Sequence, residues 1–434
     1  GGINVATGAY SLACNTTGAD NTANGGYAMK ENTTGTGNVG VGRSALRCNT
    51  TANDNTAVGC GALCLNTTGT ENTAVGKDAL KANTTARQNT ALGTSALRDN
   101  TTGACNTAIG FNNLVLNTTG SCNTAVGRAS MDANTDGCCN TAVGNNSLSS
   151  NTTGDNNTAV GHLSLAVSTT GSENTAIGLE SLCSNTTGVR NSAVGHTAMR
   201  CNTTGADNTA LGYQALCANT TSNQNVAIGR DALKVNTGTG ANTAVGDDSL
   251  VANTTGTQNT GLGINTGREI TSGSNNLVLG TNAGRSTSPS GSITTASNNV
   301  VLGNDNVTDL WCADTSISSS DLRDKTDIED FTHGLDFVIK LNPKTYRWDK
   351  RSWYVTGDES VLDVTPDGSK KKNKKHVGFM AQDVLALEQE IGFANDKDDM
   401  LVVNQTEDET RYGLKYERLV PVLVNAIKEL KAEI

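Results

Sequence analysis

Residues 55–88 read NTAVGCGALCLNTTGTE followed by NTAVGKDALKANTTARQ, which are two copies of one 17-residue unit. Outward from this stretch, a phrase close to Asn-Thr-Ala-Val-Gly recurs every 17 residues from Asn4 to Asn276, in 17 copies without an insertion. A fixed period of this length, with one structural unit in each repeat, is typical of solenoids and repeat arrays. The sequence therefore predicts an elongated stack of coils over most of the chain.

The opening phrase of each repeat predicts a short β-strand. Repeat positions are numbered 1–17 from the first Asn. Position 2 is nearly always β-branched, position 3 is Ala or Gly in the first 16 copies, and position 4 is mostly Val, Ile or Leu. This alternation predicts a strand whose positions 2 and 4 share one face, while position 3 points the other way. Position 5 is Gly in every copy, which predicts a turn or a close backbone approach.

The rest of the unit predicts a second turn and a thin core. Position 9 is Leu or Met in 15 consecutive copies, and positions 12–15 read close to Asn-Thr-Thr-Gly, which is turn chemistry. Coils stacked at roughly 4.8 Å would form Asn, Thr, Val and Leu ladders over about 80 Å. Few sizeable apolar groups occur in each coil. We therefore expect several parallel chains, most simply three, with the small position-3 residues at their close approach.

The C-terminal part of the chain has a different composition. Residues 320–434 contain 18 of the 32 Lys and Arg residues and 23 of the 42 Asp and Glu residues. We predict a mainly β protein: a parallel β-solenoid or β-roll shaft over residues 1–283, a linker and terminal strand segment over 284–319, and a small α+β domain over 320–434 that ends in a helix. The chain begins within a repeat, so we expect a fragment that lacks an anchoring end.

Several function classes are disfavoured by composition. The net charge of −10 and the lack of a recurring basic face argue against nucleic-acid binding. No run of 18 apolar residues predicts a membrane-inserted segment. The 12 cysteines show no metal-ligand spacing, and neither a metal nor a cofactor is expected. No glycosidase pair of acids is evident in the shaft, so an enzyme acting on polysaccharide is disfavoured.

Three local patterns each allow two interpretations. Cys105, Cys122 and Cys139 are 17 residues apart and are expected to stack, either permitting a disulfide or, more simply, as three buried or semi-buried free thiols. The basic run Lys370–Lys375 is interpreted as a solvated hairpin tip in preference to a binding patch. The recurring Asn-Thr-Thr is formally a glycosylation sequon, but turn geometry explains its recurrence, and we expect no sugar.

The end of the chain shows a heptad pattern. Apolar residues fall at alternating spacings of four and three, which suits helix pairing or a three-helix bundle. The alternative is a helix packed on its own domain. The pattern comprises Tyr416, Val420, Leu423, Ile427, Leu430 and Ile434.

Two resemblances add to these predictions. The repeats resemble those in the heads of trimeric autotransporter adhesins and in phage tail fibres. Three ordered motifs in residues 320–434 resemble the C-terminal intramolecular chaperone domain of endosialidase-type phage tailspikes and tail fibres. The motifs are SDLRDKTDI at 320–328, LNPKTYRW at 341–348 and HVGFMAQDV at 376–384.

The second resemblance implies a self-cleaving serine peptidase that acts once and on no external substrate. It places the nucleophile at Ser320, the general base at Lys325, and the cut at the Ser319–Ser320 bond. Asp321 and Arg323 belong to the same motif and are not expected to be catalytic. The alternative is that Ser320 and Asp321 only cap a helix.

Together the repeats and the motifs predict a homotrimeric structural fibre. The leading hypothesis is a phage tail-fibre or tailspike shaft that attaches to a host. It would assemble in the host cytoplasm, reside in the virion tail, and join an upstream virion-anchoring region or tail proteins. The host receptor is unknown. The alternative hypothesis is a cell-surface trimeric adhesin with the same type of trimerisation domain.

Overall fold

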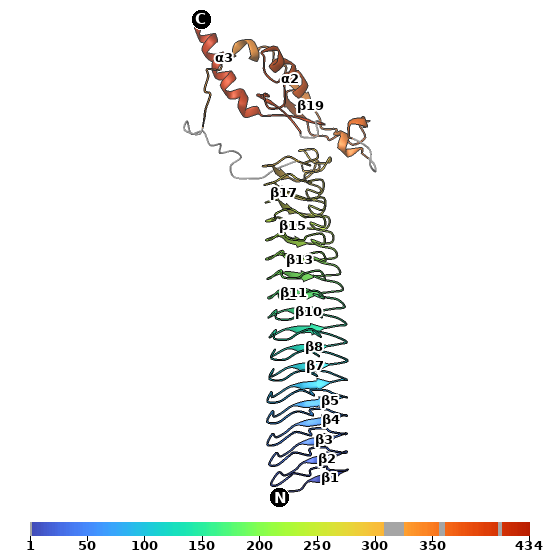
Figure 1. Ribbon diagram of the computed structural model, residues 1–434. Coiled ribbons are helices and arrows are strands. Elements are labelled where there is room, and N and C mark those ends of the chain that lie inside the picture. Colours follow the sequence, from blue (N-terminus) through green and yellow to red (C-terminus); the bar gives the residue numbers. More distant parts are fainter. Residues whose placement is uncertain (1, 308–324, 356–360, 407–409) are drawn as a thin grey trace. The chain divides into compact units, whose positions relative to one another are not determined.

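The computed structural model forms two compact units, residues 1–265 and 266–434. Figure 1 shows the stacked coils of the first unit and the mixed fold of the second. The predicted boundaries at 283 and 319 stay predictions. The residues that the structure describes are 2–307, 325–355, 361–406 and 410–434.

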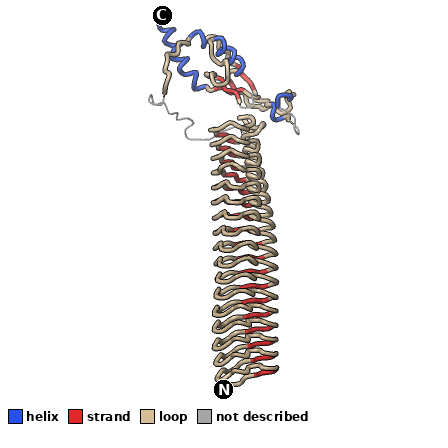
Figure 2. The backbone as a smooth tube through the Cα atoms, viewed as in Figure 1, coloured by secondary structure: helices blue, strands red, loops and turns tan. Residues whose placement is uncertain are grey.

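The first unit is a parallel β-solenoid with one three-residue strand in each coil. Each strand occupies repeat positions 2–4 and pairs in parallel with the strand 17 residues later, as in Thr158 with Thr175. Figure 2 shows these strands aligned along one side of the stack. The predicted fold class is therefore confirmed for the shaft. Strands β1–β16 are Val5–Thr7, Thr22–Asn24, Val39–Val41, Thr56–Val58, Thr73–Val75, Thr90–Leu92, Thr107–Ile109, Thr124–Val126, Thr141–Val143, Thr158–Val160, Thr175–Ile177, Ser192–Val194, Thr209–Leu211, Val226–Ile228, Thr243–Val245 and Thr260–Leu262.

The small residues at position 3 face the inside of the coil. Ala159 and its equivalents in β2–β16 are buried within one chain, as is Leu165 at position 9. A Cβ added to Gly40, one of the glycines at position 3, would lie 3.0 Å from the Cε atom of Met29 at position 9. The position-9 side chain therefore fills the interior and leaves room only for Ala or Gly opposite it. The expectation that position 3 lies where chains approach each other was wrong, because its space is used within the coil.

Two buried asparagine ladders converge on one carbonyl group in most of the coils. Asn174 at position 1 donates through Nδ2 to the Gly188 carbonyl at 2.9 Å and to Oδ1 of Asn157 in the preceding coil at 3.2 Å. Asn185 at position 12 donates to the same Gly188 oxygen at 3.0 Å. Each Asn side chain thus satisfies polar groups that would otherwise be buried without partners. Asn185 opens an Asn-Thr-Thr sequence and is fully buried, which agrees with the turn interpretation of this motif.

The glycine at position 5 is required by both conformation and space. Gly161 has φ +135°, and a Cβ there would lie 2.4 Å from the carbonyl oxygen of Gly178 in the next coil. Left-handed backbone also occurs at positions 7, 9 and 17, for example at Leu165 with φ +50°. Such conformations are uncommon for residues other than Gly. Their repetition shows that the coil closes through several tight turns, which the stacking of neighbouring coils holds in place.

The stacked cysteines are free and exposed. Cys105, Cys122 and Cys139 occupy position 17 at an outward corner, where the backbone is left-handed with φ of 58–60°. The expectation of buried or semi-buried thiols was therefore wrong for these three residues, although they are free thiols as expected. By contrast, burial raises the pKa of the thiols of Cys64 and Cys217, which lie at position 10.

The second unit begins with β17 and β18, which pair in parallel at an offset of 23 residues. Antiparallel pairs β19–β20 and β21–β22 follow, together with three helices, which confirms the predicted α+β domain ending in a helix. None of the helices in the described residues is long and apolar enough to cross a membrane. The elements are β17 Leu277–Leu279, β18 Val300–Leu302, α1 Leu335–Val338, β19 Lys344–Tyr346, η2 Arg351–Trp353, η3 Val361–Asp363, β20 His376–Gly378, α2 Ala381–Glu390, β21 Val403–Gln405, β22 Tyr412–Leu414, η4 Tyr416–Arg418 and α3 Leu419–Glu433.

A small core joins the helices of this unit to β21. Glu388 on α2 is fully buried, and its carboxylate accepts the backbone N–H groups of Leu401, Val402 and Val403 at 2.6–3.0 Å. Three donors balance the cost of burying this charged group. They also fix α2 against the start of β21. The buried apolar residues of the core are Phe337, Val384, Leu387, Val402, Val403, Leu419 and Val422.

Candidate functional site

The predicted cleavage residues lie mostly outside the described residues. Ser319, Ser320, Asp321 and Arg323 belong to the segment 308–324 that the structure does not describe. Lys325 is described, and its side chain is exposed. The Ser320–Lys325 dyad therefore stays a prediction.

The segment that follows Lys325 is held against α3. The backbone N–H of Leu335 donates to Oε2 of Glu429 at 2.5 Å, and Asn425 Nδ2 donates to the Phe331 carbonyl oxygen at 2.5 Å. A Cβ added to Gly334 would lie 2.7 Å from the backbone nitrogen of Ala426 on α3, so Gly allows this close approach. The chain just after the predicted cut is thus anchored on the C-terminal helix. Sequence reasoning missed Asn425 and Glu429, because their partners lie more than 90 residues away.

Helix α3, labelled in Figure 1, has two apolar faces according to the burial of its side chains. One face packs into the core through Leu419, Val422 and Ala426, each of which is less than 10% exposed. The predicted heptad seam lies elsewhere on the helix, and Ile427 in the seam is 66% exposed. The alternative of a helix packed on its own domain is therefore confirmed for α3, although residues outside the seam make most of that contact. Whether the seam also pairs with another helix stays a prediction. The exposed seam residues are Tyr416, Val420, Leu423, Ile427, Leu430 and Ile434.

The start of the seam is fixed by the domain itself. The hydroxyl of Tyr416 accepts the backbone N–H of Phe379 at 3.1 Å, and the two rings stack with centroids 6.1 Å apart. Gly378 provides the space, because a Cβ there would lie 2.5 Å from the Tyr416 hydroxyl oxygen. The HVGF sequence of the third motif therefore has a structural role: it positions the residue that begins the seam.

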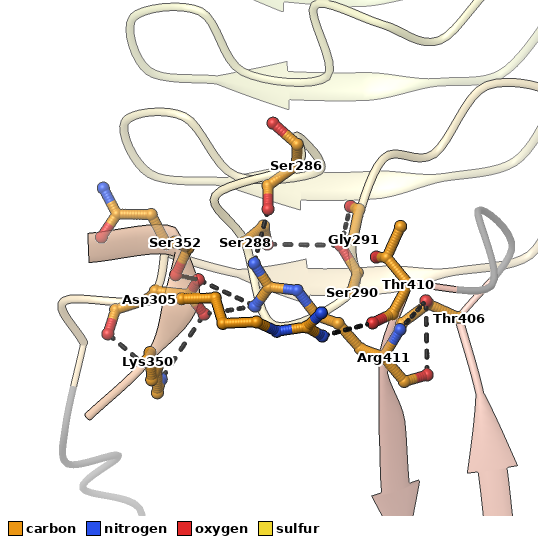
Figure 3. A network of polar contacts seen from close by, with 12 residues as sticks. Ser286, Ser288, Ser290, Gly291, Asp305, Lys350, Ser352, Thr406, Thr410 and Arg411 are labelled. Carbon is orange, nitrogen blue, oxygen red and sulfur yellow. Dashed lines mark hydrogen bonds and ion pairs between the residues drawn. The ribbon is translucent and has the colours of Figure 1, made fainter. Parts of the chain in front are cut away.

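A buried polar network surrounds Asp305 (Figure 3). The side chain of Asp305 is only 4% exposed, and Arg411 Nη1 contacts both of its carboxylate oxygens at 2.8 Å. Ser352 Oγ donates to the same carboxylate, and Lys350 Nζ lies 3.4 Å from it. Arg411 Nη2 also donates to the Ser286 carbonyl at 2.5 Å. One carboxylate thereby joins the segment before the predicted cleavage bond to residues that follow it.

The network was not evident in the sequence. Asp305 lies in an Asn-Asp-Asn stretch that is typical of a turn, and Arg411 follows 106 residues later. The one available signal was an acidic residue that directly follows an uncharged stretch, residues 286–304. Removing Arg411 would leave the carboxylate of Asp305 with less compensation, and breaking a buried pair of this kind costs about 3–5 kcal/mol.

The basic run at Lys370–Lys375 is exposed, as expected of a solvated hairpin tip. Two of its ammonium groups lie over aromatic rings: Lys370 Nζ is 5.0 Å from the Tyr354 centroid, and Lys372 Nζ is 4.8 Å from the Trp353 centroid. Exposed cation–π contacts contribute about 0.5–1 kcal/mol each. They hold the run against the domain. Among the described residues, no group of three or more His, Cys, Asp or Glu side chains is arranged to hold a metal ion.

One comparison with known families finds a similarity in the C-terminal part. Residues 320–393 match the family model described as the chaperone of endosialidase. The matched range starts at Ser320 and includes all three sequence motifs. It ends before residue 434, to which the sequence resemblance extends. No curated protein and no solved structure matches the chain. The chain therefore joins a β-solenoid to a segment similar to endosialidase chaperones.

Proposed function

We propose that this chain is the subunit of a homotrimeric fibre, whose C-terminal domain drives trimerisation and folding and is then released by self-cleavage at Ser319–Ser320. The observation that carries the proposal is the apolar seam of α3, which is exposed in the single chain. The seam follows the segment 320–393 that matches the chaperone family. An exposed apolar stripe on a helix is stabilised when it meets an equivalent stripe on another copy.

The repeat gives the chaperone a physical task. Neighbouring coils are nearly identical, so two shafts that slip by one coil make almost the same contacts. Such uniform pairing specifies register weakly. Long-range registration between chains is also slow. A domain that assembles first at one end would set the register there, and the coils would then stack from that end.

The proposed cleavage uses the residues of the first motif. Lys325 takes the proton from Ser320 Oγ, and the oxygen attacks the carbonyl carbon of Ser319. The acyl group passes to Oγ, the C–N bond breaks, and the leaving nitrogen receives the proton. Water then hydrolyses the resulting ester and frees residues 320–434. A Lys serves as a base for Ser when its surroundings lower its pKa, which is the chemistry of Ser–Lys enzymes.

The mass of the purified polypeptide tests the cleavage. The wild-type chain is expected to yield two pieces separated between Ser319 and Ser320, whereas Ser320→Ala should remain whole, because it has no nucleophile. Ser318→Ala is the matched control and should cleave like the wild type. Intact wild-type protein under conditions where it is fully assembled would show that no self-cleavage occurs.

Deleting residues 320–434 tests the chaperone role. The truncated shaft is expected to be recovered mainly as aggregate, because its register is not set and its apolar surface stays exposed during assembly. The Ser320→Ala chain, expressed in parallel, supplies the control with an attached domain. Stable, ordered trimers from the truncated chain would contradict the proposal; light scattering and circular dichroism would detect them.

We further propose that the fibre is a phage tail fibre or tailspike that contributes to host attachment in the virion tail. The resemblance of both parts of the chain to phage fibres supports this assignment. A cell-surface trimeric adhesin is the second candidate, since its head repeats also resemble these coils. An export signal encoded upstream would favour the adhesin, whereas a virion-anchoring domain would favour the phage fibre.

A further inference from the structure

A continuous apolar stripe lies on the outer face of the first unit. Position 4 is Val, Ile or Leu in each of the 14 strands from β3 to β16. These side chains point away from the coil interior, and the three leucines are about half exposed: Leu92 is 46%, Leu211 47% and Leu262 52% exposed. Because the strands pair in register, the side chains form one straight ladder along the strands seen in Figure 2.

The stripe and its neighbour at position 2 carry no charge. In β2–β16, position 2 is Thr, Val or Ser, and position 4 is aliphatic except for Asn24. Other outward positions of the same coils carry many charges. At position 6 these are Arg43, Lys77, Arg128, Arg230 and Asp247; at position 10 they are Lys30, Arg47, Lys81, Arg98, Asp132, Arg200, Lys234 and Arg268; at position 17 they are Asp54, Glu71, Glu173, Arg190 and Asp207. Charge is therefore excluded from one face and tolerated elsewhere.

No side-chain hydrogen bond in the coils that the structure describes accounts for the uniformity of this face. The threonine ladder at position 13 provides a contrast, because its hydroxyls hold the stack together: Thr152 Oγ1 donates to the Thr169 carbonyl at 3.1 Å. Within residues 2–265, no threonine at position 2 donates its hydroxyl to another residue in this way. The aliphatic groups at position 4 lie on the outer face, where the preference of strands for β-branched residues would also admit the polar Thr. Their retention in coil after coil indicates a contact outside the chain.

We infer that the face formed by positions 2 and 4 is the surface through which the shafts of identical chains pack, with a second parallel copy of this chain as its occupant. This inference rests on the proposed homotrimer and assigns its shaft interface. A second copy has the same spacing between coils, so each aliphatic group meets an equivalent environment along the entire ladder. A partner with another repeat would lose register within a few coils.

The size of the face suits such a contact. Fourteen aliphatic side chains that each expose on the order of 60 Å² amount to about 800 Å², which is the area that one partner buries in a stable interface. The largest apolar patch of a typical monomer is smaller, about 300–600 Å². Lateral packing would also explain how coils with thin cores, built around Ala and a single Leu, gain enough buried apolar area.

A photo-crosslinking amino acid tests the assignment. A benzophenone side chain placed at Val160 (position 4) in the uncleaved Ser320→Ala chain is expected to give covalent dimers on a denaturing gel, with cross-links mapping to residues 143–177 of the second chain. Ile177 carries the same label in a second variant, in case one position disturbs folding. Thr170 at position 14, exposed on another face, is the matched control and should give at least tenfold less dimer.

Light scattering on the same samples distinguishes an error in the assigned face from an error in the proposed trimer. Trimers that give no cross-links from either Val160 or Ile177 would overturn the assigned face and leave the proposed trimeric function standing. Monomers would overturn both. Equal cross-linking from Thr170 would show that chains meet through another face, and links far from residues 143–177 would exclude parallel, in-register packing.

Discussion

An Ile427→Asp chain is expected to be monomeric at concentrations where the wild type is trimeric. Ile427 is 66% exposed in the single chain and lies in the middle of the α3 seam. Burying an Ile side chain is worth about 1.5–3 kcal/mol, and a trimer would lose this contribution in each of its three chains. The association constant should fall on the order of a thousandfold or more. Three carboxylates placed together in an apolar seam would weaken association further, since burial disfavours their charge.

Light scattering of the uncleaved chain measures this effect. Lys428→Asp is the control: it also introduces an Asp, at the adjacent exposed position outside the seam, and should remain trimeric. Circular dichroism should be unchanged in both variants, because neither side chain contributes to the core. An Ile427→Asp chain that still forms trimers of wild-type stability would exclude the seam as the interface.

The same measurement decides the number of chains. Val420, Ile427 and Ile434 occupy one set of seam positions, and Tyr416, Leu423 and Leu430 occupy the other. β-branched residues alternating with Leu favour two-stranded parallel coiled coils. The exposed seam therefore supports association between chains, and the number of three chains is proposed on the family resemblance. If the wild-type protein has the mass of two chains, the seam forms a two-stranded coiled coil and the proposed trimer is wrong.

The coil fold was predictable because its information is local and repeated. An alternating phrase, an unvaried Gly and a turn sequence recur at one period, so every copy supports the same interpretation. The orientation of the strand was harder to derive. Val160 looks like a core residue beside Ala159, and larger apolar groups usually face inward. Here Leu165 and the asparagine ladders fill the interior, so Ala159 points inward and Val160 outward.

The contacts of the C-terminal unit were less predictable because they join distant residues. Asp305 and Arg411 are 106 residues apart, and neither stands in a recognisable pattern. The heptad seam was visible in the sequence, since its spacing is local. Whether that seam faced the domain or solvent depended on Leu419 and Val422, which fall on another face of the same helix and pack into the core.

A large loss of local stability is expected for Asn157→Ala, which interrupts the asparagine ladder. Asn157 Nδ2 donates to the Gly171 carbonyl at 2.8 Å and to Oδ1 of Asn140 at 3.1 Å, while its own Oδ1 accepts the backbone N–H of Asn174 at 3.1 Å. Alanine removes all these contacts and leaves polar groups of the neighbouring residues buried with fewer partners. Each such group costs about 1–3 kcal/mol. We expect the coils around residue 157 to lose roughly 3 kcal/mol or more of local stability.

Amide hydrogen exchange detects this loss at the site where it occurs. The N–H of Asn174 should exchange at least about 100-fold faster in Asn157→Ala, since each 1.4 kcal/mol corresponds to a factor of ten. Coils far from the substitution should keep their protection, because each repeat contacts mainly its neighbours. The adjacent Asn156→Ala is the matched control: Asn156 is exposed at position 17 with φ +59°, where another coil already carries Ala241 at φ +58°. Equal exchange at Asn174 in both variants would show that the buried ladder does not hold the coils together.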